Sequence, residues 1–318
     1  MRIAVLNNLR ASQSDAKVSR MLSFLKEHPS IPHVETENNE HVRDALTILQ
    51  RQGIDVLAVN GGDGTLQRVL TEILGNLTDA PLPLIAPLRG GRTNMSALDI
   101  GSHRTPVVAL SVLLEAVQNG TIAQSIVERP VLRVDLGAHC PVQYGMFFGI
   151  GVMHRTIELK HRILPQRHFQ GLLGSGAFVG TLLTRAIFGS MRGLLTPDKV
   201  EVCLTDQQVW ADKFLLVMAT TLDRLFLRMQ PFWGKEAAPI RLTAIAAGAR
   251  RSLFGALKVL CGHPPATNLQ KTGYTSRNVH RVTLRLGCGV IIDGELFPPQ
   301  PDRLVSIAAD HRIRFVHS

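Results

Sequence analysis

The residues with the clearest chemical meaning form a short glycine-rich turn, Asn60-Gly61-Gly62-Asp63-Gly64-Thr65. The apolar run before it, residues 55–59, predicts a buried strand. After it, apolar side chains recur at helical spacing, at Leu66, Val69, Leu70, Ile73 and Leu74. The turn therefore joins the carboxyl end of a strand to the amino end of a helix, where free backbone N–H groups and the helix dipole favour anions.

A carboxylate in the middle of a loop that favours anions is unexpected and requires an explanation. Glycines 61, 62 and 64 let a bulky anion approach the backbone, because no Cβ is in the way. A phosphate would repel Asp63 unless this side chain holds Mg²⁺ or takes a proton, and that combination indicates phosphoryl transfer. The alternative is an ordinary turn in which Asp63 caps the helix that follows, since Asp is a favoured N-cap residue.

Length and composition describe a folded protein with room for two domains, since it has 318 residues, 45% of them hydrophobic. The formal net charge of +10 favours anionic partners such as nucleotides or an anionic membrane surface. Only 5% of the residues are aromatic, so we expect no nucleic-acid partner. The four cysteines are far apart and lack C-x-x-C spacing, which indicates buried thiols in a reducing cytoplasm.

Strand-like and helical patterns alternate in the first third of the chain. Short apolar strands are expected at residues 3–6, 55–59 and 84–87 and a weak strand at residues 33–36, with amphipathic helices between and after them. Repeated βα units predict an α/β fold with a doubly wound parallel sheet, whose ligands bind at the carboxyl ends of the strands. We therefore predict a nucleotide-binding domain over residues 1–121, which residues 305–318 could rejoin.

From residue 122 onward the pattern is mainly β. Strand-like runs separated by turn residues predict an antiparallel, β-sandwich-like domain with inserted helices over residues 122–304, which would bind the substrate. One uncharged run, residues 169–184, is shorter than the ~20 residues of a membrane span, so we interpret it as a buried or interfacial helix. The amphipathic stretch 250–260 either packs in the core or docks on anionic lipid.

One more set of side chains has a spacing that could bind metal. His154, Glu158 and His161 would share one helix face. The spacing is not that of a His-Glu-x-x-His site, and basic residues crowd it, so a polar helix facing solvent or lipid is the favoured interpretation.

The sequence resembles the diacylglycerol kinase catalytic domain family, which includes bacterial lipid kinases and sphingosine kinases and shares a core with NAD kinases. Three motifs in the family's order carry the resemblance: Gly61-Gly62-Asp63-Gly64-Thr65, Gly91-Arg92-Thr93-Asn94 and Asp293-Gly294-Glu295. The first strand departs from the family pattern. It ends Asn7-Asn8-Leu9-Arg10, which keeps the family's Asn but lacks its Pro and Gly.

The resemblance implies a role for each motif. It places ATP phosphates on Gly61, Gly62, Gly64 and Thr65, and completes the nucleotide pocket with Asn7, Gly91, Thr93 and Asn94. It places Asp63 beside the γ-phosphate and Mg²⁺, with Glu295 as a partner ligand of the metal. Asp293 would be the general base on the lipid hydroxyl, although the sequence leaves open whether Asp63 or Asp293 takes the proton.

The combined prediction is an ATP-dependent lipid kinase that uses Mg²⁺ and transfers the γ-phosphoryl group to a lipid alcohol such as diacylglycerol. We expect it to be cytoplasmic and peripherally associated with an anionic membrane. Two alternatives stay open: a soluble, NAD kinase-like enzyme acting on a small molecule, and a nucleotide-binding homologue without catalysis. The oligomeric state is also open, with a homodimer as one option.

Overall fold

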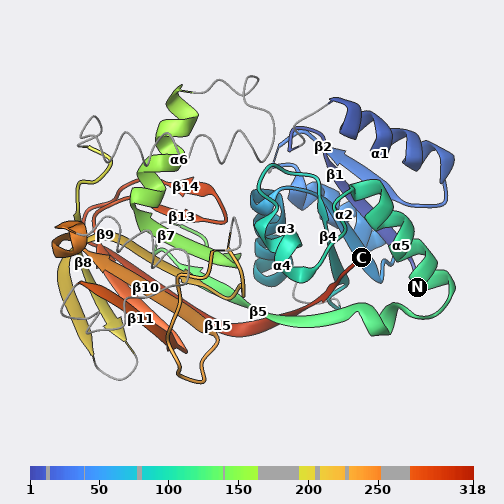
Figure 1. The fold of residues 1–318 in the computed structure, drawn as a ribbon. Coiled ribbons are helices and arrows are strands. Elements are labelled where there is room, and N and C mark those ends of the chain that lie inside the picture. The colour runs from blue at the N-terminus through green and yellow to red at the C-terminus, as the bar shows by residue number, and fades with distance from the viewer. Residues whose placement is uncertain are drawn as a thin grey trace. The chain divides into compact units, whose positions relative to one another are not determined.

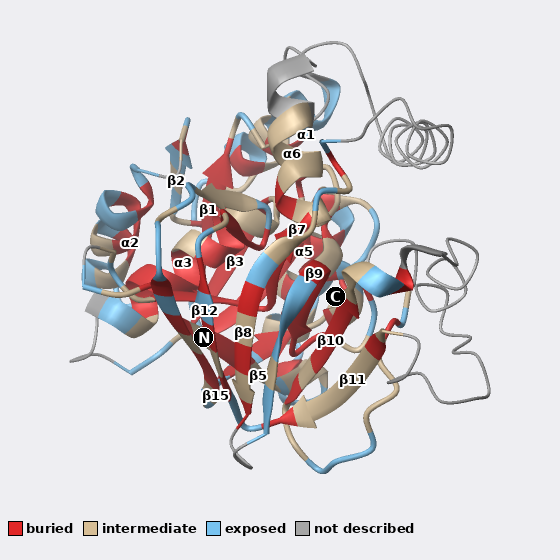
Figure 2. Cartoon of the chain, turned by 90° about the vertical axis from the view of Figure 1, so that its left-hand side faces the viewer, coloured by how far each residue is buried: buried red, intermediate tan, exposed pale blue. Residues whose placement is uncertain are grey.

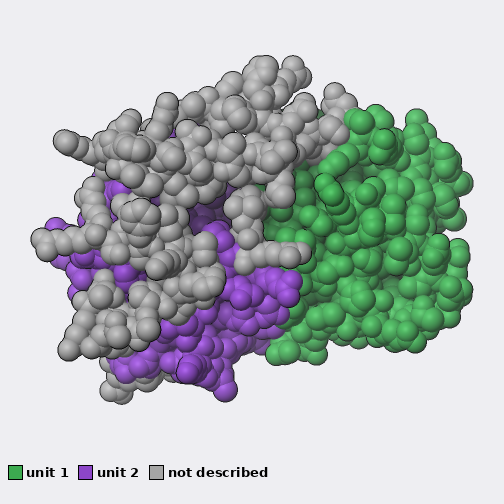
Figure 3. All heavy atoms as spheres, in the orientation of Figure 1, with its two compact units in different colours: residues 1–129, 170–172, 312–318 green, residues 130–169, 173–311 purple. Residues whose placement is uncertain are grey.

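The computed structural model describes residues 1–11, 15–38, 40–76, 81–138, 140–163, 193–204, 208–225, 229–251 and 273–318. They form two compact units, which Figure 3 colours separately. Unit 1 contains residues 1–129 and 312–318, and unit 2 contains the described residues between 130 and 311. The chain enters unit 2 within β5 (Ile126–Asp135) and returns to unit 1 within β15 (Arg303–Val316).

Unit 1 is built on a parallel sheet. Its strands are β1 (Ile3–Asn8), β2 (His33–Thr36), β3 (Val56–Gly61) and β4 (Leu84–Arg89), in the order β4-β3-β1-β2 (Figure 1). The end of β15 joins them beside β4, where Phe315 pairs with Ile85. Every residue of β1 and β3 is buried, as expected for strands covered on both faces.

Helices pack against both faces of this sheet. α1 (Asp15–Glu27) and α5 (Pro106–Gln118) share one apolar core with the strands. α2 (Val42–Arg51) and α3 (Asp63–Asn76) pack against each other and against β1, β2 and β3. A short helix, α4 (Met95–Ile100), follows β4, and a 3₁₀ turn at Ile122–Ser125 leads into β5.

Unit 2 is antiparallel. Its main strand order is β14-β13-β7-β9-β8-β12-β15, while β10 and β11 pair beside β9, and β5 and β6 beside β15. The bounds are β6 Gln143–Gly145, β7 Phe147–Gly151, β8 Asp198–Leu204, β9 Val209–Thr220, β10 Ile240–Ala246, β11 Tyr274–Val279, β12 Arg281–Leu286, β13 Val290–Ile292 and β14 Glu295–Phe297. Helix α6 (Val152–Ile163) contacts β7, β9, β13 and β14.

The inward side chains of these strands form one core, for example Phe148, Val217, Leu242 and Ile307, and Figure 2 shows β10 as largely buried beside the mainly intermediate β11. A 3₁₀ turn at Ala247–Arg251 follows β10. The predicted fold class, a parallel α/β sheet followed by antiparallel strands with inserted helices, is confirmed.

Several features named from the sequence lie outside the described residues: the apolar run 169–184, most of the amphipathic stretch 250–260 and one of the four cysteines, Cys261. Among the residues that are described, no helix has the length and apolar character needed to cross a membrane.

Candidate active site

The glycine-rich turn has the predicted position between a strand and a helix. β3 ends at Gly61 and α3 begins at Asp63, and the Leu66 N–H donates to the Gly62 carbonyl at 3.0 Å. The Thr65 side chain lies directly over Gly61, since a Cβ on Gly61 would come within 2.6 Å of the Thr65 Cβ. The turn therefore needs glycine at position 61 for a steric reason.

The second glycine loop lies against the first. After β4, Asn94 adopts the left-handed conformation (φ 51°) and closes the loop onto Gly91. Its Oδ1 accepts the Gly91 N–H and its Nδ2 donates to the Gly91 carbonyl, both at 2.7 Å. A Cβ on Gly91 would overlap the Cα of Gly62, so the two loops touch backbone to backbone.

This contact gives a direct prediction. Gly91→Ala must push the two loops apart, and we expect it to lower the free energy of unfolding by about 1–3 kcal/mol, as overpacking does. Gly62→Ala is the matched control, because its Cβ would meet the Gly91 Cα at 3.5 Å, an ordinary contact. Urea unfolding of both variants tests this, and equal stability of the two would contradict the backbone contact.

Asp63 joins the two loops electrostatically. Its Oδ2 accepts the Met95 N–H at 3.0 Å and its Oδ1 accepts the Ser96 N–H at 2.8 Å. Asp63 thus caps the amino end of α4, not its own helix α3, so the capping alternative holds in a modified form. Burial raises the pKa of the Asp63 carboxyl, although the backbone N–H groups of Ser96 and Met95 oppose that shift.

Asparagine side chains meet at the carboxyl ends of β1 and β3. Asn7 and Asn60 are paired in register, and the Asn60 Nδ2 donates to the Asn7 Oδ1 at 2.7 Å. Both residues are buried, at 2% and 8% exposure. The Asn7 Nδ2 and the Asn60 Oδ1 have no hydrogen-bond partner among the described residues. Since an unpaired buried polar group costs about 1–3 kcal/mol, these atoms indicate a ligand at this edge of the sheet.

Asn8 explains how the first loop keeps its shape without the family's Pro and Gly. Its Oδ1 accepts the N–H groups of Arg10 (3.1 Å) and Ala11 (3.2 Å), which closes a turn immediately after β1. Its Nδ2 donates to the Thr65 Oγ1 at 2.9 Å and so ties that turn to α3. Sequence reasoning gave Asn7 a role in the nucleotide pocket but gave none to Asn8 or Asn60. An Asn at a strand end, where Asn favours such turns, was the available signal.

The third motif forms the hairpin between β13 and β14. Ile292 pairs with Glu295, and both Asp293 (φ 47°) and Gly294 (φ 92°) have positive φ, which is the type I′ geometry that Asp-Gly favours. The turn does not require the Asp293 carboxylate to be buried, yet Asp293 is only 5% exposed and its Oδ2 accepts the Met146 N–H at 2.8 Å. A Cβ on Gly145 would overlap this oxygen.

The predicted site residues thus fall into two groups. Unit 1 brings together Asn7, Gly61, Gly62, Asp63, Gly64, Thr65, Gly91, Thr93 and Asn94. Asp293 and Glu295 lie in unit 2, on one hairpin. Within the described part of the chain, no three His, Cys, Asp or Glu side chains are placed to share a metal ion. His154 lies 4.0 Å from Glu158, and the His161 side chain is outside the description.

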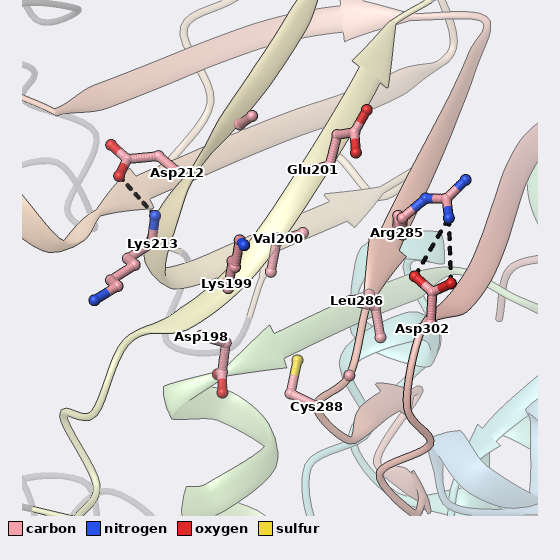
Figure 4. Close-up of a pocket in the computed structure, with 12 residues that line it drawn as sticks. Asp198, Lys199, Val200, Glu201, Asp212, Lys213, Arg285, Leu286, Cys288 and Asp302 are labelled. Atoms are coloured by element: carbon pink, nitrogen blue, oxygen red, sulfur yellow. Dashed lines mark hydrogen bonds and ion pairs between the residues drawn. The ribbon is translucent and has the colours of Figure 1, made fainter.

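A separate groove of about 680 Å³ on unit 2 contains none of these residues (Figure 4). It is lined by β8, β9, β12 and the segment after β12, and its acidic side chains nearly balance its basic ones. Arg285 faces Asp302 there at 3.2 Å, and Asp198 pairs with Arg155. Because four acidic side chains line the groove against three basic ones, the groove does not favour an anionic ligand such as a nucleotide.

Cys288 lines this groove and gives a test of local burial. Burial and the nearby Asp198 raise the pKa of its thiol to about 12, so almost no thiolate exists at neutral pH. We expect native Cys288 to resist alkylation by iodoacetamide at pH 7.5 and to react after unfolding in guanidinium, as read by peptide mass spectrometry. Rapid labelling in the native protein would contradict the raised pKa of the Cys288 thiol.

Known proteins resemble this chain in sequence or in fold. Residues 2–124 match the model of the diacylglycerol kinase catalytic domain. A crystal structure from Bacillus anthracis str. Sterne, provisionally described as a diacylglycerol kinase, superposes with a TM-score of 0.67 at 14% identity, over 100% of this chain and 97% of that one. A structure from the same organism, described as that of a diacylglycerol kinase, gives 0.64 at 13% identity, with the same coverage.

Yeast NADH kinase complexed with NADH gives a TM-score of 0.50 at 9% identity, over 100% of this chain and 84% of that one. At such identities these structures show a shared fold only. None of the curated proteins matches the sequence significantly. The match to the diacylglycerol kinase catalytic domain model and the two joined glycine loops lie in the same part of the chain, within residues 2–124.

Proposed function

We propose that this protein is an ATP-dependent lipid kinase, which transfers the γ-phosphoryl group of ATP to the hydroxyl of a lipid alcohol such as diacylglycerol. The observation that carries the proposal is the pair of glycine loops at the carboxyl edge of the parallel sheet, which Asp63 links while Asn94 closes the second loop onto Gly91. This is where an α/β sheet binds ligands, and it lies at the amino end of α3.

The nucleotide would lie along these loops. The backbone of residues 61–65 and 91–94 would face its phosphates, and the unpaired amide atoms of Asn7 and Asn60 would hydrogen-bond to it. The polar, glycine-lined edge suits phosphates better than an apolar ligand. Asn8 and Asn94 would hold the loops in place before the nucleotide arrives, so that little ordering is needed on binding.

The residues of unit 1 fit a magnesium ion that arrives with the nucleotide. Mg²⁺ is usually bound through one or two carboxylates plus substrate phosphates, so a cage of protein ligands is not required. Asp63 has two engaged oxygens, but a carboxylate offers about four lone-pair sites, which leaves room for a cation. When bound, the ion would neutralise charge that develops on the transferred phosphoryl group.

Asp293 would act on the lipid hydroxyl that accepts the phosphoryl group. As the acceptor oxygen forms its bond to the γ-phosphorus, its proton would pass to the Asp293 carboxylate, and the bond from the γ-phosphorus to the leaving oxygen of ADP would break. The hydrogen bond from the Met146 N–H holds this carboxylate in one orientation. Since the chain carries a formal net charge of +10, we further propose that it works at an anionic membrane surface.

The decisive experiment incubates the full chain with Mg²⁺ and γ-labelled ATP. One arm contains anionic vesicles carrying a panel of lipid alcohols, and the other contains NAD as a soluble acceptor. Label in a phospholipid product supports the proposal. Label in NADP supports the soluble alternative, which the shared fold with NADH kinase makes worth including. Nucleotide binding without any transfer would indicate a homologue that has lost catalysis. Co-sedimentation with the same vesicles tests membrane association.

A further inference from the structure

In unit 2, both the backbone N–H and the backbone carbonyl of Met146 are hydrogen-bonded to neighbouring segments. Its N–H donates to the Asp293 Oδ2 at 2.8 Å. Its carbonyl accepts the Thr220 hydroxyl at 2.7 Å and the Thr221 N–H at 3.1 Å. The two threonines at the end of β9 and the Asp293 turn therefore lie on opposite sides of Met146, and both are hydrogen-bonded to it.

The two threonines differ in what their hydroxyls do. The Thr220 hydroxyl is fully satisfied, because it donates to Met146 and accepts the Leu222 N–H at 3.1 Å. The Thr221 hydroxyl is buried, in a residue 5% exposed, and has no hydrogen-bond partner among the described residues. A buried hydroxyl without a partner costs about 1–3 kcal/mol, whereas valine would fill nearly the same volume without that penalty. The Thr221 hydroxyl therefore destabilises the folded state unless a ligand forms a hydrogen bond with it.

We propose that the Thr221 hydroxyl is a substrate contact, which hydrogen-bonds an oxygen of the acceptor next to the hydroxyl that is phosphorylated. This inference rests on the proposed function and specifies its substrate. Asp293 would accept the proton of the attacking hydroxyl, while Thr221 would donate to a second oxygen close by. The site therefore selects alcohols that carry a neighbouring oxygen, such as the ester of a glycerolipid, over simple long-chain alcohols.

Stability and kinetics of two valine variants separate this role from a structural one. Thr221→Val should keep or raise the melting temperature, because it removes an unpaired buried hydroxyl. Thr220→Val should lower it, because it breaks two hydrogen bonds. With diacylglycerol in mixed micelles, Thr221→Val should lower kcat/KM by about ten- to hundredfold. With a long-chain 1-alkanol it should change kcat/KM little, and Thr221→Ser should restore the wild-type preference.

The possible outcomes are distinct. Unchanged kcat/KM of Thr221→Val with diacylglycerol overturns the Thr221 assignment and leaves the kinase function standing. An equal loss with both acceptors, or a lower melting temperature for Thr221→Val, means that the hydroxyl serves the fold and also overturns the assignment. If the wild-type protein phosphorylates no lipid alcohol at all, the proposed function fails first, and the acceptor contact fails with it.

Discussion

Asp293→Asn is expected to lower turnover by about 10²–10⁴-fold, the usual contribution of a general base, and to leave the free energy of unfolding unchanged. The fold should tolerate the change for two reasons. Asn-Gly is at least as favourable as Asp-Gly in a type I′ turn, which the φ values of 47° and 92° require. The amide oxygen of Asn can also accept the Met146 N–H in place of the Asp293 Oδ2.

The measurement is the initial rate with γ-labelled ATP and the lipid acceptor, beside urea unfolding of the same preparation. Asp293→Ala is the control for the structural part of the effect. It leaves the buried Met146 N–H unpaired and places a residue with a Cβ, but no polar group, at positive φ. We expect it to lose about 1–3 kcal/mol of stability in addition to activity. Near-normal turnover of Asp293→Asn would leave Asp63 as the proton acceptor.

The parallel half of the fold was predictable because its signals are long and repeated. β1 and β3 each begin with an uninterrupted apolar run, residues 3–6 and 56–59, and α2 buries one apolar face, formed by Val42, Ala45, Leu46 and Leu49. The elements that sequence reasoning missed are short. α4 has six residues, and β13 and β14 have three each, so none spans enough periods to show a pattern. Their existence depends on tertiary partners, such as Asp63 at the start of α4.

The site was predictable as a set of loops but not as a set of contacts. Glycine at 61, 62 and 91 is visible in the sequence, whereas the overlap of a Gly91 Cβ with Gly62 depends on how two distant loops meet. Thr220 and Thr221 show the same limit on a smaller scale. They are adjacent residues of one type, and only the fold distinguishes the satisfied hydroxyl from the unpaired one.

Asp63 in the glycine-rich turn can combine two roles, helix capping and catalysis, that the sequence left as alternatives. Asp63 was interpreted either as a catalytic carboxylate or as a helix cap. The structure shows a cap, but of a helix that starts 32 residues later in the chain. A carboxylate in that position fixes the second loop against the first and still has lone pairs directed elsewhere. Capping and catalysis are therefore compatible.

Asp63→Asn is the second large-effect prediction, and it should reduce both activity and stability. We expect phosphoryl transfer to fall by about 10²–10³-fold, since the proposed function places the Asp63 charge beside the transferred group and the variant lacks it. Asn has only one oxygen, so its NH₂ group must face either the Met95 or the Ser96 N–H, and one of these donors is left unpaired. The free energy of unfolding at pH 7 should fall by about 1 kcal/mol.

A matched variant separates the two effects. Asp99 is also a buried carboxylate of this region, in the last turn of α4, and pairs with Arg129 at 3.6 Å. Asp99→Asn should lower stability at least as much as Asp63→Asn, because it leaves Arg129 without this partner, but it should retain most of the transfer activity. Equal activity losses in the two variants would mean that Asp63 acts only through the stability of α4.

The pH dependence of stability gives a test of Asp63 that needs no substrate. Burial raises the pKa of its carboxyl in the folded state, so the folded protein holds this proton more tightly than the unfolded chain does. The stabilising contribution of the protonated form is complete below the ordinary pKa of about 3.9 and is lost as the pH rises through the folded value. The unfolding free energy of the wild type relative to Asp63→Asn should therefore decline over that range. A relative stability that rises instead would show that the two backbone N–H groups outweigh burial, and that the carboxylate needs no cation.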